Sequence, residues 1–277
     1  MPVDDYVRLV VKMQLKFEPG ADYQYSNFGY RALAALIARI TGRDYADFME
    51  QEVFGPLGMK DSGVARVARP RSESCIAEGF QFQLSDPAGQ PCSAPGEKGR
   101  NYGTGYGSGG IYASANDLLR WDRVLAGDSF LSAEQKAKLF RPVRENYACG
   151  WIVKKSGLAD RLYQMHSGAN EGFFSQMMRI PEDDLVIIAV DNVYKTRKIN
   201  EVLKHLFRLS RSLPYRDTLG YNPVSIHYAE GVTQFCAERL LKSQMFDAFR
   251  VAVFGYGVPR VRRCATTLGF EGETPLA

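Results

Sequence analysis

The sequence predicts an α+β fold, in which helices come first and an antiparallel sheet with flanking helices follows. Two observations support this prediction. Apolar residues recur at helical spacing before residue 54, whereas strand-like runs follow one another after residue 149. The connections between these runs are too short for parallel crossovers, so neighbouring strands must be antiparallel. Helices and strands that are separated in this way form layered α+β domains.

The helical part is marked by apolar spacing and by residues that begin or end helices. Residues 28–41 place Leu and Ile side chains at helical spacing, and Gly42 ends the run. A second short helix is expected over residues 44–54. Ser114 and Ser132 each stand three positions before an acidic or amide residue, as in the capping boxes that begin helices.

The remaining predicted elements are an irregular region, four strands and a terminal helix. Residues 69–110 are rich in Gly, Pro and Ser and show little periodicity, which indicates a long irregular region. A helix is expected over residues 198–209. The predicted strands cover residues 149–155, 161–167, 173–180 and 185–191.

The composition is typical of a globular domain with a sizeable core. The 277 residues are 45% hydrophobic and 24% charged, and a net charge of +4 does not indicate a nucleic-acid partner. The five cysteines are widely spaced and the histidines number only three, so we expect no metal site and no cofactor. The sequence shows neither an apolar run of transmembrane length nor a signal peptide.

Two short motifs supply chemically useful groups. Tyr25-Ser26-Asn27 provides a phenol and an amide, and His166-Ser167-Gly168 provides an imidazole beside a turn bounded by glycine. These groups suit a site that handles a carbonyl substrate. Such a site also needs a nucleophile beside a base, usually Ser-x-x-Lys on one turn of a helix. No serine in this sequence has a lysine three residues later.

Four segments in order resemble the serine β-lactamase and penicillin-binding-protein superfamily. The first contains PGADYQYSNFGY, and the last begins HSGANEGF. The segments are similar above all to class C β-lactamases, D-aminopeptidases and esterase-like hydrolases. The resemblance covers residues 1–205 and implies a β-lactamase/transpeptidase-like fold. The matching segments are residues 15–63, 107–125, 149–151 and 166–192.

The resemblance implies a catalytic role for three residues, which should converge around one cleft. Tyr25 matches a general base or proton shuttle, a role that a phenol fills only with nearby cations or concerted proton transfer. Asn27 offers a donor and an acceptor to a substrate amide. His166 stands where many relatives have the lysine of Lys-Thr-Gly, which favours D-aminopeptidase-like or esterase-like chemistry. The alternatives are a core aromatic residue, a turn-forming asparagine and a structural histidine.

The residues that follow His166 are the expected substrate-binding residues: Ser167, Gly168 and Ala169. Gly168 lets a substrate backbone approach the strand closely. The resemblance implies that the N–H group of Ala169 is the second oxyanion donor, the first belonging to the nucleophilic serine. The expected substrate is a small-molecule or peptide-like acyl compound, and the motifs do not define it further.

The sequence departs from the family pattern at both ends. Only 24 residues precede Tyr25, too few for the N-terminal strands and the Ser-x-x-Lys helix that relatives have there. We therefore expect a truncated hydrolase domain over residues 1–205, with a separately encoded N-terminal fragment as one candidate partner. The tail, residues 206–277, matches nothing in the family. Because an open sheet edge invites aggregation, we expect this tail to cover the edge, with residues 249–254 as a strand.

Three functional hypotheses follow from these observations. The chain is a truncated or split serine hydrolase that is inactive alone, a pseudoenzyme that binds acyl-peptide ligands, or an interaction protein that reuses the fold. A neighbouring reading frame with Ser-x-x-Lys would favour the first hypothesis. Ligand binding without turnover would favour the second, and a pocket filled by the tail would favour the third.

Overall fold

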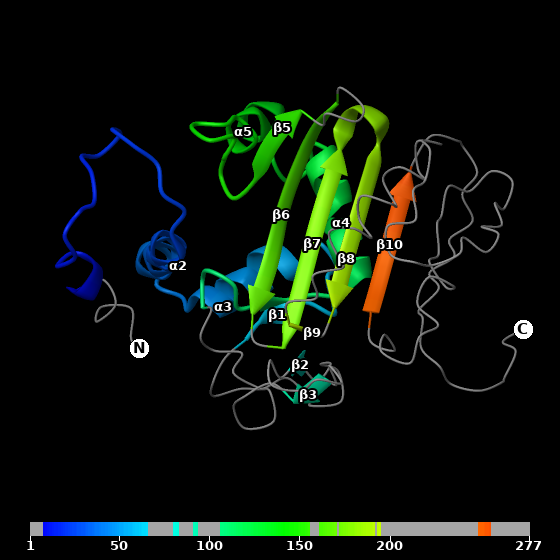
Figure 1. The fold of residues 1–277 in the computed structure, drawn as a ribbon, viewed down its shortest axis with the longest axis horizontal. Coiled ribbons are helices and arrows are strands. Elements are labelled where there is room, and N and C mark those ends of the chain that lie inside the picture. The colour runs from blue at the N-terminus through cyan, green and yellow to red at the C-terminus, as the bar shows by residue number, and fades with distance from the viewer. Residues whose placement is uncertain are drawn as a thin grey trace, which may run out of the picture.

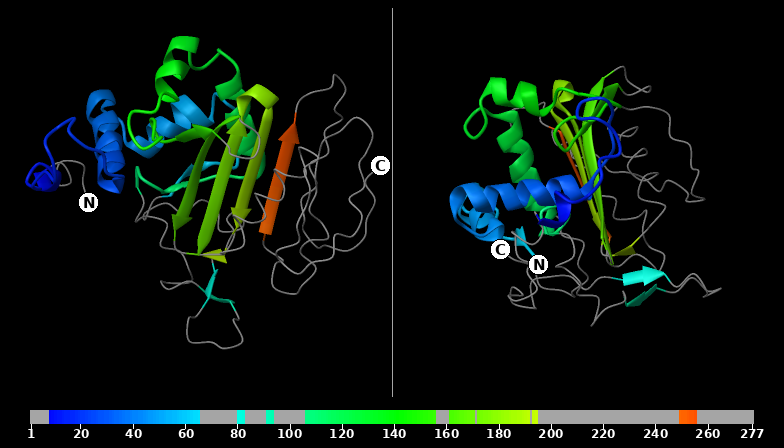
Figure 2. Two further views of the ribbon diagram at one scale, coloured as in Figure 1. Left: turned by 45° about the horizontal axis from the view of Figure 1, so that its top comes forward. Right: turned by 90° about the vertical axis from the view of Figure 1, so that its left-hand side faces the viewer.

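A computed structural model shows an antiparallel sheet with helices gathered on one face (Figures 1 and 2). The five strands lie in the order β10-β8-β7-β6-β5, and every neighbouring pair is antiparallel. The α+β prediction is therefore confirmed. The structure describes residues 8–65, 80–82, 91–93, 106–155, 161–170, 172–191, 193–194 and 249–255.

The four predicted strands are all present in the large sheet. Three of their bounds differ from the prediction: β5 begins three residues later than expected, and β6 begins one residue later and ends three residues later. The strands are β5 (Ile152–Lys155), β6 (Leu162–Asn170), β7 (Phe173–Ile180) and β8 (Leu185–Asp191).

The fifth strand, β10 (Phe249–Gly255), comes from the C-terminal part of the chain. It pairs with the whole length of β8, from Phe249 opposite Asp191 to Gly255 opposite Leu185. Figure 1 shows β10 beside β8 at the edge of the sheet. The expectation that residues 249–254 form a strand on the sheet is confirmed. Pairing of this kind satisfies backbone N–H and C=O groups that would otherwise be open along β8.

The first described long helix is α2 (Asn27–Thr41), which agrees with the predicted helix. The hydroxyl oxygen of Ser26 accepts a hydrogen bond from the N–H of Gly29 at 3.1 Å, so Ser26 is the N-cap. Gly42 ends the helix with a left-handed φ of 67°. The second predicted helix appears as α3 (Tyr45–Met49), which continues into a π-helical turn (Glu50–Phe54).

Both predicted serine caps begin helices. Ser114 precedes α4 (Ala115–Ala126) and accepts a hydrogen bond from the N–H of Asp117. Ser132 precedes α5 (Ala133–Leu139) and forms a complete capping box with Gln135, because each side chain bonds to the backbone of the other residue. These local signals correctly placed the starts of two helices.

The irregular region expected over residues 69–110 contains short strands, which corrects the prediction. β2 (Phe80–Phe82) lies between β3 (Pro91–Ser93) and β9 (Val193–Tyr194) in a three-stranded sheet. Strands of two or three residues are too short to show a period in the sequence. The helix expected over residues 198–209 lies outside the described residues. β1 (Gly63–Val64) and β4 (Ile111–Tyr112) form a further, two-stranded antiparallel sheet.

The main core lies between the large sheet and α4. Val186 and Ile188 of β8 are fully buried and pack with Leu125 of α4. Asp122 of α4 forms an ion pair with Arg179 of β7 at 2.5 Å, and both side chains are almost completely buried. The ion pair joins α4 to the sheet at a point where water is excluded.

Helix α2 is apolar on two opposite sides. Ala34 and Ala35 are buried, and Ala34 packs into a second core cluster that includes Tyr45 and Phe54. On the other side, Leu33, Leu36 and Ile40 are 52%, 51% and 74% exposed. We call these three residues the α2 stripe. A helix that is apolar on two sides is typical of a buried position between layers. In the described parts of the chain, no helix has the length and hydrophobicity needed to cross a bilayer.

Candidate active site

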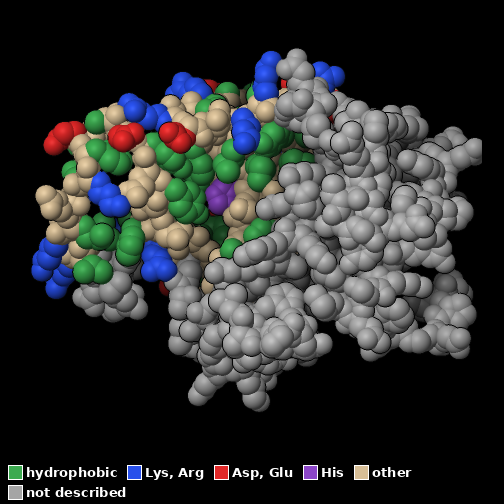
Figure 3. Space-filling view, in the orientation of Figure 1, with side chains coloured by type: hydrophobic (Ala, Val, Ile, Leu, Met, Phe, Trp, Pro, Cys, Tyr) green, Lys and Arg blue, Asp and Glu red, His purple; other side chains and the backbone are tan. Residues whose placement is uncertain are grey.

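The two sequence motifs meet at one end of α2. Tyr25 immediately precedes the N-cap of α2, and His166 lies on β6. Their ring centroids are 6.1 Å apart, with an angle of 31° between the ring planes. Figure 3 shows the imidazole at the surface beside hydrophobic side chains. The expected proximity of Tyr25 and His166 is confirmed. Asn27 is the exposed first residue of α2, and its convergence on the same site stays a prediction.

A third aromatic residue, Tyr147, completes this cluster and was not predicted from the sequence. Its hydroxyl group lies 3.2 Å from Nε2 of His166. Its ring is 5.8 Å from that of Tyr25 in an edge-to-face arrangement and 5.4 Å from that of Tyr23. Tyr147 lies in the irregular segment between α5 and β5, two residues before the Cys149-Gly150-Trp151 match. This short distance in sequence from a segment that matches the family was the one signal that could have pointed to Tyr147.

The tyrosines behind His166 are neutral at physiological pH. Burial raises the pKa of Tyr147, and a hydrogen bond with Tyr30 and the nearby phenols of Tyr25 and Tyr23 raise it further. Burial also raises the pKa of Tyr30, although its hydrogen bond with Tyr147 acts in the opposite direction. These two phenols can therefore donate and accept hydrogen bonds, but neither is available as a phenolate base.

The expected substrate-binding residues lie at the end of β6 that is open to solvent. Ser167, Gly168 and Ala169 are all exposed. β5 pairs only with residues 162–165 of β6, so among the described strands none pairs with residues 166–170 on that side. Backbone groups along this edge can therefore pair with an extended ligand.

The neighbouring strand leaves little room for a side chain at Gly168. It lies opposite Ser175 of β7, and a Cβ atom on Gly168 would lie 2.6 Å from the hydroxyl oxygen of Ser175. A larger residue at Gly168 would have to displace this hydroxyl group. This contact with Ser175 favours a glycine here, and the close approach of a substrate backbone to Gly168 stays a prediction.

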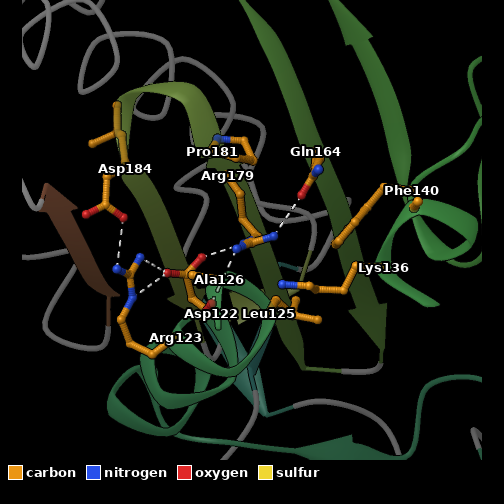
Figure 4. Close-up of a pocket in the computed structure, with 12 residues that line it drawn as sticks. Asp122, Arg123, Leu125, Ala126, Lys136, Phe140, Gln164, Arg179, Pro181 and Asp184 are labelled. Carbon is orange, nitrogen blue, oxygen red and sulfur yellow. Dashed lines mark hydrogen bonds and ion pairs between the residues drawn. The ribbon is translucent and has the colours of Figure 1, made fainter. Parts of the chain in front are cut away.

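A separate pocket of about 540 Å³ lies between α4, α5 and the sheet (Figure 4). Its charged groups are already paired within the protein. Arg179 bonds to Asp122, Arg123 to Asp122 and Asp184, and Lys136 to Asp128. These ion pairs therefore connect α4 to the sheet, and α5 to the segment between α4 and α5. The described part of the chain contains no group of three or more His, Cys, Asp and Glu side chains arranged to hold a metal ion.

Comparisons with known proteins agree with the fold. Over 188 residues the chain is 31% identical to penicillin-binding protein 4* of Bacillus subtilis, an alignment that covers 64% of this chain and 41% of the relative. Over 192 residues it is 28% identical to the D-alanyl-D-alanine-carboxypeptidase/endopeptidase AmpH of Escherichia coli, covering 62% and 46%. The chain thus spans less than half the length of either curated relative.

A solved structure and a family profile extend this likeness. The D-amino acid amidase of Ochrobactrum anthropi, complexed with L-phenylalanine amide, has the same fold, with a TM-score of 0.60 and 20% identity. The match covers 74% of this chain and 61% of the amidase chain. The profile of the Beta-lactamase family matches residues 2–206, which is well over half of the sequence. The chain therefore belongs to the Beta-lactamase family.

Proposed function

We propose that this chain provides the substrate-binding strand and the proton-transfer residues of a serine hydrolase. The reaction is acyl transfer from an amide or ester substrate, of the D-aminopeptidase-like or esterase-like kind. The nucleophile belongs to polypeptide outside these 277 residues, so the chain alone is inactive. The single observation that supports this proposal most strongly is the 6.1 Å separation of the Tyr25 and His166 rings.

The proposed substrate lies along the open side of β6. Its acyl part is extended beside residues 166–170, where main-chain groups bind it as an added strand. Gly168 allows close approach because no side chain intervenes. The N–H group of Ala169 donates one hydrogen bond to the carbonyl oxygen as negative charge develops there. A substrate with a peptide-like amide fits this arrangement.

In the proposed reaction, a serine hydroxyl attacks the substrate carbonyl carbon, and the leaving group departs with a proton. Tyr25 takes the hydroxyl proton and passes it to the leaving amine or alcohol. Water then attacks the acyl-enzyme by the same route in reverse order. Asn27 bonds to the substrate amide, and the imidazole of His166 lines the site beside the reacting carbonyl.

Two observations favour an external nucleophile. No Ser-x-x-Lys occurs in the sequence, and Ser26, the serine beside Tyr25, already serves as the N-cap of α2. The α2 stripe is also exposed on the helix that begins just after Tyr25. We propose that the nucleophile-bearing polypeptide packs on this stripe and thereby reaches Tyr25.

Labelling with a fluorophosphonate probe tests this function. The isolated chain should not be labelled, and it should not hydrolyse nitrocefin or p-nitrophenyl esters. Co-expression with a fragment of a Beta-lactamase-family protein, chosen because it carries Ser-x-x-Lys, should produce labelling of the added serine. Replacing Tyr25 by Phe should then reduce labelling by at least about 100-fold, because general acid–base catalysis contributes that much.

The controls separate the proposed function from its alternatives. Stoichiometric labelling of any serine in the isolated chain would show that the nucleophile lies within it. Leu36→Asp should prevent complementation without changing the isolated fold, because Leu36 is half exposed. Binding of a D-amino acid amide, detected by NMR, with no turnover in any complemented sample would favour a pseudoenzyme.

A further inference from the structure

His166 has both ring nitrogens engaged, and its two partners differ in kind. Nδ1 lies 2.7 Å from the backbone carbonyl oxygen of Ser167. A carbonyl oxygen only accepts hydrogen bonds, so Nδ1 must hold a proton and donate it. Nε2 lies 3.2 Å from the hydroxyl group of Tyr147, which can donate or accept. In the neutral imidazole, Nε2 is therefore the acceptor and Tyr147 is the donor.

Residues of α2 and neighbouring aromatic rings hold the hydroxyl group of Tyr147 in place. Tyr30 of α2 shares a side-chain hydrogen bond with Tyr147. Tyr30 reaches this position beside Gly150, where a Cβ atom would lie 3.2 Å from the Tyr30 hydroxyl oxygen. The rings of Tyr23 and Tyr25 pack against Tyr147. The position of the phenol is thus fixed on several sides.

We propose that Tyr147 is a positioning residue that holds the His166 ring where Nδ1 donates to the Ser167 carbonyl oxygen and thereby maintains its tautomer, and that Tyr30 orients the Tyr147 hydroxyl group. The importance of His166 in this inference rests on the proposed function. The tautomer itself follows from the contacts of the folded chain. A fixed tautomer matters because it decides which ring nitrogen holds a proton and which one can accept one.

The two hydroxyl groups can serve His166 in both of its charge states. With a neutral ring, Tyr30 donates to Tyr147 and Tyr147 donates to Nε2. When the imidazole is protonated on Nε2 as well, its N–H donates to the Tyr147 oxygen. Tyr147 then donates to the Tyr30 oxygen, and the Tyr30 hydrogen turns away. The proton stays on the imidazole, and only hydroxyl hydrogens rotate. Because burial keeps Tyr147 neutral by raising its pKa, the phenol does not compete as a base.

NMR of protein labelled with ¹⁵N in its histidine rings tests this inference without substrate or nucleophile. The chain has three histidines, and His166→Gln identifies the signals of His166. At a pH where the ring is neutral, native His166 should show a protonated Nδ1 and an unprotonated Nε2. Tyr147→Phe frees the ring to turn away from the Ser167 carbonyl oxygen, so it should shift the ring toward the Nε2–H form, which imidazole side chains prefer in water. Tyr30→Phe should give a smaller shift in the same direction.

Two matched variants control the experiment. Tyr163→Phe removes a hydroxyl group from the same strand as His166 and should leave the tautomer unchanged. Tyr25→Phe should also leave it unchanged, although it abolishes the acyl transfer of the proposed function. Failure of the proposed function and failure of this inference are therefore distinguishable. The inference is overturned if native His166 holds its proton on Nε2, or if folded Tyr147→Phe shows an unchanged tautomer. If Tyr147→Phe does not fold, the spectrum of the native protein alone decides.

Discussion

Gly107 lies directly against Ala34 of α2. A Cβ atom on Gly107 would lie 2.5 Å from the Ala34 Cβ and 3.2 Å from the Cα of Arg31, and Gly107 has a φ of 79°. Arg31 also donates a hydrogen bond from Nε to Ser108 at 3.2 Å. The glycine-rich turn around Gly107 thus packs against α2 and braces this helix, which begins just after Tyr25.

Gly107→Ala should therefore destabilise the protein and displace α2. The added methyl group meets backbone and a short side chain, and alanine also disfavours positive φ, so we expect a loss of about 1–3 kcal/mol. Urea denaturation measures this loss. Gly109→Ala is the matched control, because nothing lies within 4 Å of its Cβ position. An equal effect of both substitutions would contradict the bracing role of Gly107.

Removing the carboxylate of Asp122 should cost more than removing an exposed one. Asp122→Ala leaves Arg179 as a buried charge without this partner, which typically costs about 3–5 kcal/mol. Glu134→Ala breaks the exposed pair with Lys138 on α5 and should cost less than about 0.5 kcal/mol. Thermal and urea unfolding of both variants give the comparison. A loss below 1 kcal/mol for Asp122→Ala would show that water reaches Arg179.

Alkaline pH should destabilise the folded chain through its buried tyrosines. The pKa values of Tyr30, Tyr45 and Tyr147 are raised, in each case chiefly by burial. Below about pH 10, the ordinary pKa of tyrosine, these phenols are protonated in both folded and unfolded chains. Above it the unfolded chain binds fewer protons, so the free energy of unfolding falls as pH rises.

Urea midpoints at pH 9, 10 and 11 measure this alkaline dependence. Tyr147→Phe removes one titrating group, so the decline from pH 10 to pH 11 should be shallower in this variant than in the native chain. A decline that is the same in both proteins would mean that Tyr147 ionises equally well in the folded state.

Deleting residues 249–277 should open the edge of the large sheet. The deletion removes β10 and leaves the backbone groups of β8 without the partner strand seen in the structure. We expect a lower melting temperature and oligomers in size-exclusion chromatography. Deleting only residues 256–277 retains β10 and is the matched control. A monomeric protein with an unchanged melting temperature after the longer deletion would show that β10 contributes little.

Most of the large sheet could be predicted because its strands have a clear apolar pattern and short connections. The end of α2 was also visible, since Gly42 follows the last residue at helical spacing and glycine commonly ends helices. Tyr147 could not be found in this way, because it lies in an irregular segment and its role depends on contact with a distant strand. The Asp122–Arg179 pair was missed for the same reason. Each charge looks solvent-exposed in its own segment, and only the fold brings the two together.

The position of β10 also has a consequence for synthesis of the chain. Strands β5 to β8 can form a meander as soon as residue 191 is available, because consecutive strands are neighbours. Their last partner begins only at residue 249. Throughout the intervening elongation, the nascent chain presents β8 as an open edge, and closing it requires a contact of long sequence separation, which forms slowly. The edge of β8 can thus be paired with β10 only after residue 255 has left the ribosome.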